Sequence, residues 1–252
     1  MTTQQQPIVL ITGGSRGIGA AAALLAARQG WRVAINYAQQ AEAAQALAGQ
    51  VRALGASALT VQADIGNEQQ VLAMFRQVDE QFGRLDALVN NAGVVDARAR
   101  VDEMSVERLT RMMRINVVGS FLCAREAVRR MSTRHGGRGG AIVNVSSAAA
   151  RLGAPAQYVD YAASKGAIDT FTLGLAQEVA DEGIRVNAVR PGLIDTEIHA
   201  SGGMPRRAFD LAGNVPMKRV GTAQEVAQSI VWLLSPEASY VTGALLDVGG
   251  GR

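Results

Sequence analysis

Short apolar runs alternate along this chain with longer segments in which apolar residues recur at helical spacing. The apolar runs have the length and composition of buried parallel strands, and they cover residues 8–11, 31–37, 58–63, 85–90, 141–145, 184–189 and 244–248. The segments between them predict helices at residues 20–28, 40–54, 68–82, 106–131, 158–180 and 223–234. We therefore expect an α/β fold: a Rossmann-like, doubly wound, seven-stranded parallel sheet with helices on both faces and a ligand crevice at the carboxyl ends of the strands.

Length and composition favour one globular unit. The chain has 252 residues, 48% of them hydrophobic, and no linker, internal repeat or low-complexity tract interrupts the pattern. We expect a single domain over residues 1–252. The polar residues 2–6 lack the basic-then-apolar plan of a signal peptide, and no apolar run is long enough to cross a membrane, so the expected compartment is the cytoplasm.

Composition also argues against several classes of function. The net charge of +3 is small and the arginines are dispersed, which speaks against nucleic-acid binding. The single cysteine, Cys123, excludes an intramolecular disulfide. The two histidines, His135 and His199, lie far apart in sequence, so we expect no metal site built from cysteine and histidine.

The first predicted strand runs directly into a glycine-rich loop, TGGSRGIG at residues 12–19, and an alanine-rich helix follows. Glycines let a backbone approach a pyrophosphate closely, and a helix N-terminus offers unpaired N–H groups and the positive end of a dipole. The spacing is Gly-x-x-x-Gly-x-Gly, which differs from the better-known Gly-x-Gly-x-x-Gly fingerprint. The candidate cofactor-binding residues in this loop are Gly13, Ser15, Arg16, Gly17, Ile18 and Gly19.

Tyr161 and Lys165 lie four residues apart in the helix predicted at residues 158–180. Residues at this spacing share one helix face, so the ammonium group can lie beside the phenol. A nearby cation lowers the pKa of a tyrosine, which suits it to exchange a proton with an alcohol or carbonyl oxygen. The chain has only two lysines, Lys165 and Lys218, and of its four tyrosines only Tyr161 has such a partner. Taken alone, the pair is also compatible with an ordinary solvated helix face.

Further short motifs lie on the expected elements and in the order found in a known family. They are Asn-Asn-Ala-Gly at residues 90–93, Asn116 and Ser147 with Tyr161 and Lys165, and Pro-Gly at residues 191–192 with Thr196. In these motifs, and from end to end, the chain resembles the short-chain dehydrogenases/reductases of the single-domain type. The pattern is similar to that of 3-oxoacyl-[acyl-carrier-protein] reductases and of sugar dehydrogenases.

The resemblance implies a catalytic set of Asn116, Ser147, Tyr161 and Lys165. In such a set Tyr161 passes the proton, Ser147 donates a hydrogen bond to the substrate oxygen, Lys165 holds down the pKa of Tyr161 and binds the nicotinamide ribose, and Asn116 positions a water. One residue more than the usual family spacing separates Ser147 from Tyr161, so the adjacent Ser146 is the alternative. The extra residue lies in the loop at 151–160, where Tyr158 either lines the substrate pocket or packs over the loop.

The resemblance also implies the other contacts to the cofactor. Asp64 is expected to accept a hydrogen bond from the adenine amino group, with Ile65 packed beside it. The remaining contacts are expected from Asn36, Tyr37, Asn91, Ala92, Gly93, Tyr161, Lys165, Pro191, Gly192, Ile194 and Thr196.

The sequence favours NADP(H) over NAD(H). NAD selection normally needs an acidic side chain after the second strand, and residues 34–39 contain none. Arg16 lies where it can contact a 2′-phosphate, which arginine binds as a planar fork, although a solvated loop arginine is the alternative.

The substrate is less well defined than the chemistry. We expect a small-molecule carbonyl or secondary alcohol, bound between residues 191–216 and residues 94–100, with residues 198–203 as a glycine-hinged lid. Arg206 and Arg207 are either a solvated pair or contacts for an acidic carrier. Three functions stay open: an NADPH-dependent reductase of 3-oxoacyl thioesters, a sugar or polyol dehydrogenase or small-ketone reductase, and a non-catalytic NADP-binding regulator.

Two predicted helices suggest an oligomer. The helices at 108–130 and 158–178 carry apolar residues on more than one face, and burial against the chain's own sheet accounts for one face only. Since the equivalent helices of the family pair across a two-fold axis, we expect a homotetramer.

Overall fold

The chain folds around one parallel sheet of seven strands, in the order β3-β2-β1-β4-β5-β6-β9. In the computed structural model, which describes residues 6–197, 204 and 206–252, the strands are β1 (Ile8–Ile11), β2 (Arg32–Tyr37), β3 (Ala58–Gln62), β4 (Ala87–Asn90), β5 (Gly140–Val145), β6 (Ile184–Pro191) and β9 (Leu245–Val248). Every neighbouring pair is parallel. The predicted doubly wound sheet is therefore confirmed.

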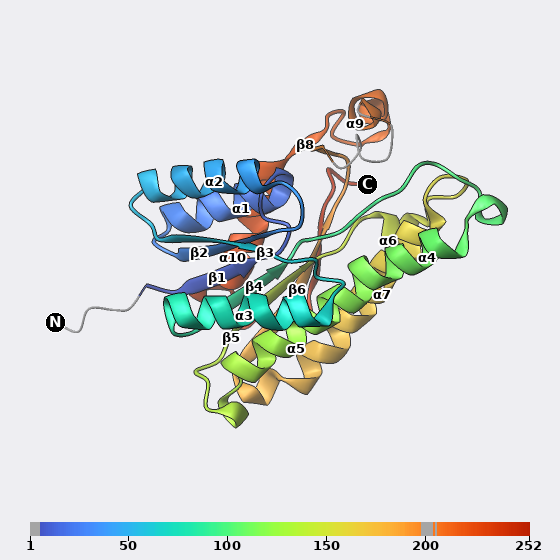
Figure 1. The fold of residues 1–252 in the computed structure, drawn as a ribbon. Helices are drawn as coiled ribbons and strands as arrows, with labels where there is room; N and C mark the ends of the chain where they lie inside the picture. Colours follow the sequence, from blue (N-terminus) through green and yellow to red (C-terminus); the bar gives the residue numbers. More distant parts are fainter. Residues whose placement is uncertain (1–5, 198–203, 205) are drawn as a thin grey trace.

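Helices cover both faces of the sheet (Figure 1). One layer contains α1 (Gly17–Arg28), α2 (Ala41–Ala53) and α10 (Ala223–Leu234), and the other contains α3 (Glu68–Phe82), α5 (Gly119–Met131) and α7 (Val159–Glu178). Alternate strand residues face the two layers: Val9 and Ile11 pack with α1, whereas Ile8 and Leu10 pack with α3. Because both faces are covered, the strands are apolar at nearly every position, which is the pattern read from the sequence.

The strand order reverses beside β1, and this reversal places the candidate site. Strands β1 and β4 are direct neighbours, with Ile11 paired to Val89. The glycine loop follows β1 and the Asn-Asn-Ala-Gly segment follows β4. Their carboxyl ends therefore lie side by side, at the position where a doubly wound sheet opens a crevice.

The helix predicted at residues 106–131 contains a π-helical turn that was not predicted from the sequence. It consists of α4 (Val106–Met113), a π-helical segment (Arg114–Val118) and α5. Such single-turn π segments occur frequently at functional sites, and this one contains Asn116.

Several short elements were also missed, because two to four residues carry no measurable periodicity. They are β7 (Ile194–Asp195) paired with β8 (Gly221–Thr222), α6 (Ala149–Leu152), α9 (Arg207–Asp210), and 3-10 turns at Val101–Glu103, Thr133–His135, Ala180–Glu182, Ala212–Asn214 and Pro236–Ala238. Across the described ranges, no helix combines the length and apolarity that a bilayer crossing needs. The division into a single domain stays a prediction.

The close packing of the glycine loop predicts that an added side chain lowers the stability of the protein. A Cβ at Gly19 would lie 2.6 Å from Nδ2 of Asn91 and 2.8 Å from the carbonyl oxygen of Gly13. We expect Gly19→Ala to lower the free energy of unfolding by about 1–3 kcal/mol, measured by denaturant titration. The control is Gly49→Ala on the exposed face of α2, where a Cβ meets nothing within 4 Å. That variant should gain about 0.5–1 kcal/mol, and equal effects at both positions would contradict the close packing.

Candidate active site

The segment after β4 holds the glycine loop in place. Nδ2 of Asn91 donates to the carbonyl oxygens of Thr12 and Gly13, at 2.9 Å each. Gly13 has φ +58°, and a Cβ there would lie 2.8 Å from Cα of Ala92. Only glycine meets both the left-handed conformation and the close approach at this position. The two predicted motifs therefore form one rigid unit.

Helix α1 begins in this loop without a side-chain cap. Arg16 is its N-cap residue, with an extended φ of −152°, and the Arg16 side chain forms no capping hydrogen bond. The first N–H groups of a helix have no partner within the helix, and the dipole favours a negative charge there. An uncapped helix start behind a glycine cradle fits a pyrophosphate, so the residues present suit a dinucleotide cofactor.

The buried side chain of Asn36 forms hydrogen bonds that support the glycine loop. It is 1% exposed, its Oδ1 accepts from the backbone N–H of Gly13 at 3.1 Å, and its Nδ2 donates to the carbonyl oxygen of Ala63 at 3.0 Å. The structure thus gives Asn36, predicted as a cofactor contact, a supporting position inside the protein. Tyr37, one residue further on, is half-buried at the end of β2.

The predicted adenine end lies after β3. The carboxylate of Asp64 accepts from the guanidinium of Arg114 at 2.8 Å and from the backbone N–H of Gly66 at 2.9 Å. Ile65 is buried, and it packs so closely on α5 that a Cβ at Gly119 would lie 2.8 Å from its side chain.

Two of the four predicted catalytic residues lie close to one glycine, and a third lies beside one of them. A Cβ at Gly93 would lie 3.4 Å from Oδ1 of Asn116 and 3.5 Å from Nζ of Lys165. Lys165 is 5% exposed, its ammonium donates to the carbonyl oxygen of Val145 at 2.7 Å, and Nζ lies 5.6 Å from the ring centre of Tyr161. The i,i+4 spacing read from the sequence therefore brings the buried ammonium beside the half-buried phenol.

Asn116 is locked by its own hydrogen bonds. Its Oδ1 accepts from the N–H of Val94 at 2.8 Å, and its Nδ2 lies 3.0 Å from the carbonyl oxygen of Val94 and 3.1 Å from Oγ of Ser164. Because Asn116 lies in the π-helical segment, the irregular turn aims this side chain at residues 93–94. The position at the site agrees with the prediction, and the water-holding role stays a prediction.

The two adjacent serines face different ways. Ser146 is 2% exposed, and its hydroxyl donates to the backbone carbonyl of Lys165 at 3.2 Å. The hydroxyl of Ser147 accepts from the N–H of Ala149 at 3.1 Å, and it lies near enough to the phenol of Tyr161 to act on the pKa of that group. Ser147, the preferred residue of the pair, is the one beside the phenol.

Burial dominates the protonation of both ionisable groups. Loss of hydration raises the pKa of Tyr161, and the hydrogen bond with Ser147 opposes that rise. The net change in the Tyr161 pKa is therefore upward, opposite to the lowering expected from the sequence, because burial disfavours the charged phenolate. Burial lowers the pKa of Lys165 to about 8, and the negative charge of Asp169 opposes that change.

The loop after β6 returns to the glycine loop. Gly192 packs against the C-terminal segment, where a Cβ would lie 2.7 Å from Cα of Gly249, and Ile194 is buried. The side chain of Thr196 lies 3.4 Å from the Cβ position of Gly17. Glu197 pairs with the guanidinium of Arg16 at 3.5 Å. Of these predicted residues, Thr196 lies beside the glycine loop, and Gly192 lies against the C-terminal segment.

Residues 94–100, predicted to border the substrate, contact the loop at residues 151–160. The N–H of Ala99 donates to the carbonyl oxygen of Gln157 at 3.1 Å, so residues 94–100 contact the loop with the extra residue. That loop contains Ala154 and Ala156 with φ of 46° and 55°, a conformation that L-residues rarely adopt. Tyr158 is buried, with its hydroxyl 3.7 Å from Sδ of Met204. The predicted lid, residues 198–203, lies outside the described residues.

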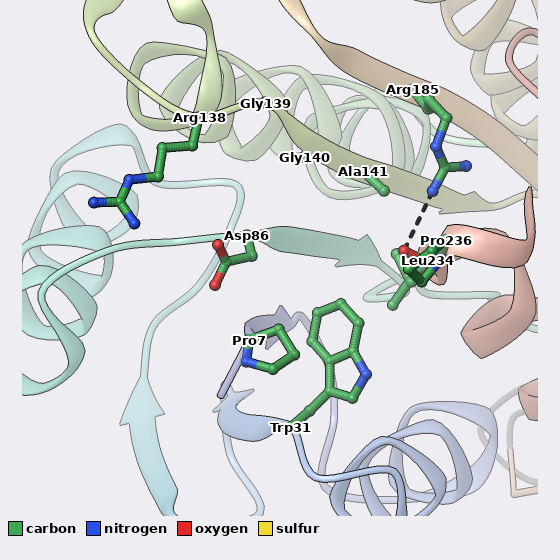
Figure 2. Close-up of a pocket in the computed structure, with 10 residues that line it drawn as sticks. All are labelled: Pro7, Trp31, Asp86, Arg138, Gly139, Gly140, Ala141, Arg185, Leu234 and Pro236. Carbon is green, nitrogen blue, oxygen red and sulfur yellow. Dashed lines mark hydrogen bonds between the residues drawn. The ribbon is translucent and has the colours of Figure 1, made fainter. Parts of the chain in front are cut away.

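A separate pocket of about 310 Å³ lies at the other end of the sheet. Figure 2 shows Pro7, Trp31, Asp86, Arg138 and Arg185 around it, with Arg185 bonded to the backbone near Leu234. Pro7 and Asp86 precede strands β1 and β4, so this pocket faces the amino ends of the strands. It contains none of the predicted site residues.

Sequence reasoning missed the charged residues that surround the catalytic helix. Asp160 is buried and pairs with Arg108 at 2.8 Å, and Asp169 is buried and pairs with Arg190 at 2.9 Å. Asp169 had a readable signal, since it follows Lys165 by four residues on the same helix face. Arg190 had no such signal in the sequence, because it lies on β6 and meets α7 only in the folded structure.

Known proteins match this chain along nearly its whole length. A sequence model of the family described as "Enoyl-(Acyl carrier protein) reductase" matches residues 13–252. A 3-oxoacyl-[acyl-carrier-protein] reductase of Synechocystis is 36% identical over 252 residues, covering 100% of this chain and 98% of that protein. The chain belongs to the short-chain dehydrogenase/reductase family. It is an oxidoreductase of that family, and the predicted resemblance is confirmed.

Other relatives cover the chain equally well. An uncharacterized oxidoreductase, YgfF, of Escherichia coli is 57% identical over 97% of this chain and 99% of its own. A solved short-chain dehydrogenase of Burkholderia cenocepacia, in complex with NADP, superposes with a TM-score of 0.90 at 34% identity, covering 99% of each chain. This likeness extends over the whole sheet and both helix layers.

The two serines provide a matched test of the site. We expect Ser147→Ala to reduce turnover about 10²–10³-fold, as for the loss of one donor to a developing oxyanion. Ser146→Ala should cost about 1 kcal/mol of stability through its lost buried hydrogen bond and leave turnover within a few-fold of wild type. Steady-state kinetics and denaturant titration measure both effects. A larger loss of turnover in Ser146→Ala would exchange the two assignments.

Proposed function

We propose that the protein is an NADP(H)-dependent oxidoreductase that interconverts a carbonyl and a secondary alcohol by hydride transfer. The observation that carries this proposal is the buried Lys165 ammonium 5.6 Å from the ring centre of Tyr161, with the Ser147 hydroxyl acting on the pKa of the same phenol. A proton donor and a neutral hydrogen-bond donor side by side suit one substrate oxygen. A fixed cation behind them suits the phenolate that remains after proton transfer.

The cofactor would be held by the backbone of the glycine loop, by the segment after β4 and by Lys165, and when bound it supplies the hydride. Ser147 donates a hydrogen bond to the substrate oxygen as negative charge develops there. Tyr161 then gives its phenolic proton to that oxygen. Its raised pKa keeps the phenol protonated at neutral pH, and an alkoxide is far more basic than a phenolate, so the transfer proceeds in the direction of reduction.

Lys165 acts on the phenolate that forms. Among the described residues its ammonium has one hydrogen-bond acceptor, the carbonyl oxygen of Val145. An ammonium has three donors, which leaves capacity for the nicotinamide ribose. Lys165 is thus proposed to hold the cofactor and to stabilise Tyr161 after it has lost its proton.

For the substrate we favour 3-oxoacyl thioesters. Support comes from the relatives named 3-oxoacyl-[acyl-carrier-protein] reductase in Synechocystis and Staphylococcus aureus, at 36% and 35% identity. The alternative is a sugar or polyol dehydrogenase, since a protein named glucose 1-dehydrogenase 2 of Bacillus subtilis is 38% identical over 96% of this chain. A non-catalytic NADP-binding regulator has no need for the Tyr161–Ser147–Lys165 arrangement.

The deciding experiment is NADPH consumption by the purified protein with acetoacetyl-CoA, run beside NADH and beside Tyr161→Phe. We expect consumption with NADPH, and a loss of at least about 10²-fold in the variant, which lacks only the hydroxyl group. NADPH binding, followed by fluorescence, should stay close to wild type in Tyr161→Phe.

The outcomes separate the three functions. Turnover close to wild type in Tyr161→Phe would remove this residue from the proton-transfer role. NADPH binding without turnover of acetoacetyl-CoA would move the search to glucose, polyols and small ketones. Failure of all of these substrates would favour the regulator.

The preference for NADP(H) is proposed from two features. The segment after β2 carries no acidic side chain to accept the 2′-hydroxyl of NAD. Arg16 lies at the start of α1, beside the glycine loop, where its guanidinium pairs with Glu197 across 3.5 Å. Both side chains of that pair are about half exposed, at 47% and 63%. Such an exposed ion pair is weak, so a 2′-phosphate can replace Glu197 as the partner of the Arg16 guanidinium.

Replacement of Arg16 tests this preference directly. We expect Arg16→Ala to raise the KM for NADPH about 10- to 100-fold, which corresponds to the loss of a charge-assisted hydrogen bond, and to leave the KM for NADH nearly unchanged. Steady-state kinetics with both cofactors measure the ratio. Equal weakening of both cofactors would refute the assignment of the 2′-phosphate to Arg16.

We further propose a homotetramer, assembled through α5 and α7. Phe121 on α5 and Phe171 on α7 stack with ring centres 3.7 Å apart, and Phe121 stays 46% exposed. Val118, at the end of the π-helical segment just before α5, and Leu173 on α7 are also exposed, at 48% and 41%. An apolar face of this kind on two neighbouring helices favours burial against another copy of the chain.

A further inference from the structure

The catalytic helix carries an unusual buried carboxylate behind the catalytic lysine. Asp169 lies on α7 four residues after Lys165, and Lys165 lies four residues after Tyr161. Residues at this spacing share one helix face, so the phenol, the ammonium and the carboxylate form a single stripe along α7. Asp169 and Lys165 are only 7% and 5% exposed, so little solvent screens the charges from each other.

The charge of Asp169 is only partly compensated. Arg190 places both Nε and Nη2 against the same oxygen, Oδ2, at 2.9 Å. The other oxygen, Oδ1, is buried and has no hydrogen-bond donor among the described residues. A bidentate fork would cover both oxygens. With one oxygen uncovered, a negative potential remains at the buried face of the helix.

Arg190 is moreover shared between two carboxylates. It pairs with Asp247 on the adjacent strand β9 at 3.9 Å, and Asp247 pairs in turn with Arg151 near the surface at 3.3 Å. Asp247 and Arg151 are more than 40% exposed, so solvent screens them. The nearest interior charges around Lys165 are therefore those of Asp169 and Arg190, and the phenol of Tyr161 beside it is neutral. The remaining neighbours, Gly93, Asn116 and the Val145 carbonyl, are uncharged.

A second carboxylate on the same helix provides the contrast. Asp160 is also buried and also paired with an arginine, Arg108. Both of its oxygens are covered, by Nε at 2.8 Å and Nη2 at 3.2 Å of Arg108, and by the N–H of Tyr161 at 2.9 Å. It precedes Lys165 by five residues, which puts it on a different helix face. Asp160 therefore stabilises the start of α7 without facing the lysine.

We propose that Asp169, held in place by Arg190, keeps the ammonium of Lys165 protonated at neutral pH. Asp169 touches neither substrate nor cofactor; it is a positioning residue that acts through Lys165. Burial brings the pKa of Lys165 down to about 8, and the charge of Asp169 is what opposes a further fall. Without that charge, the lysine would lose its proton within the physiological range, and the phenolate of Tyr161 would lose its cation.

The test uses the scarcity of lysine in this chain. Because Lys165 and Lys218 are the only lysines, lysine-selective ¹³C labelling of the full-length protein gives two ε-carbon signals, whose shifts report the protonation of each amine. We expect the titration midpoint of Lys165 to move to lower pH in Asp169→Asn, and that of the exposed Lys218 to stay where it is. Asp160→Asn, the matched control, should leave both midpoints unchanged.

Two results would overturn the proposal: an unmoved Lys165 midpoint in Asp169→Asn, or an equal shift in Asp160→Asn. If Asp169→Asn fails to fold, Arg190→Gln decides, because this variant removes the compensating charge and should move the Lys165 midpoint to higher pH. A midpoint that stays or falls in Arg190→Gln would then refute the role of the pair.

The consequence for turnover rests on the proposed function. In the pH profile of kcat with NADPH and an accepted carbonyl substrate, the alkaline decline should begin at lower pH in Asp169→Asn. A rate that falls equally at every pH would indicate a merely structural role. The lysine titration needs no substrate, so a failure of the proposed reaction and a failure of this inference can be told apart.

Discussion

The buried ammonium of Lys165 is the constraint around which the candidate site is arranged. Removing a cation from water is costly unless hydrogen bonds and opposite charge replace its hydration. For Lys165, the described residues supply two such groups: the carbonyl oxygen of Val145 at 2.7 Å and the carboxylate of Asp169 one helical turn away. The pKa of Lys165 is lowered to about 8 because burial disfavours the ammonium more than the charge of Asp169 favours it. Since this pKa is close to neutral pH, a change in any group next to the ammonium can change the protonation of Lys165.

The second constraint is the close approach of backbones at the crevice. The glycine loop and the segment after β4 are joined by the Asn91 side chain, and Gly13 lies against Ala92 with no room for a Cβ. This packing depends on β1 and β4 being neighbours, which follows from the reversal of strand order. The sheet topology thus sets the cradle for the cofactor, and Gly93 continues the same segment to Asn116 and Lys165.

Local patterns in the sequence predicted the sheet and the short-range motifs well. Apolar runs located all seven strands, because buried parallel strands are apolar at nearly every position. The i,i+4 pair of Tyr161 and Lys165 was readable because helix geometry fixes which residues meet. The π-helical turn around Asn116 was not readable, since it changes one hydrogen-bond register without changing periodicity. The direction of the Tyr161 pKa was wrong, because burial depends on the whole fold and not on the neighbouring residue.

The charges behind the catalytic helix show why tertiary structure limits such predictions. Asp169 lies on the same stripe as Tyr161 and Lys165, yet its effect depends on how Arg190 meets it. Arg190 and Asp247 are register partners on β6 and β9, so the sheet presents a cation and an anion together beneath α7. That cation is divided between two carboxylates and covers only one oxygen of Asp169, so the charge of Asp169 is only partly compensated. The charge of Lys165 is thus controlled by residues that only the pairing of distant strands brings together.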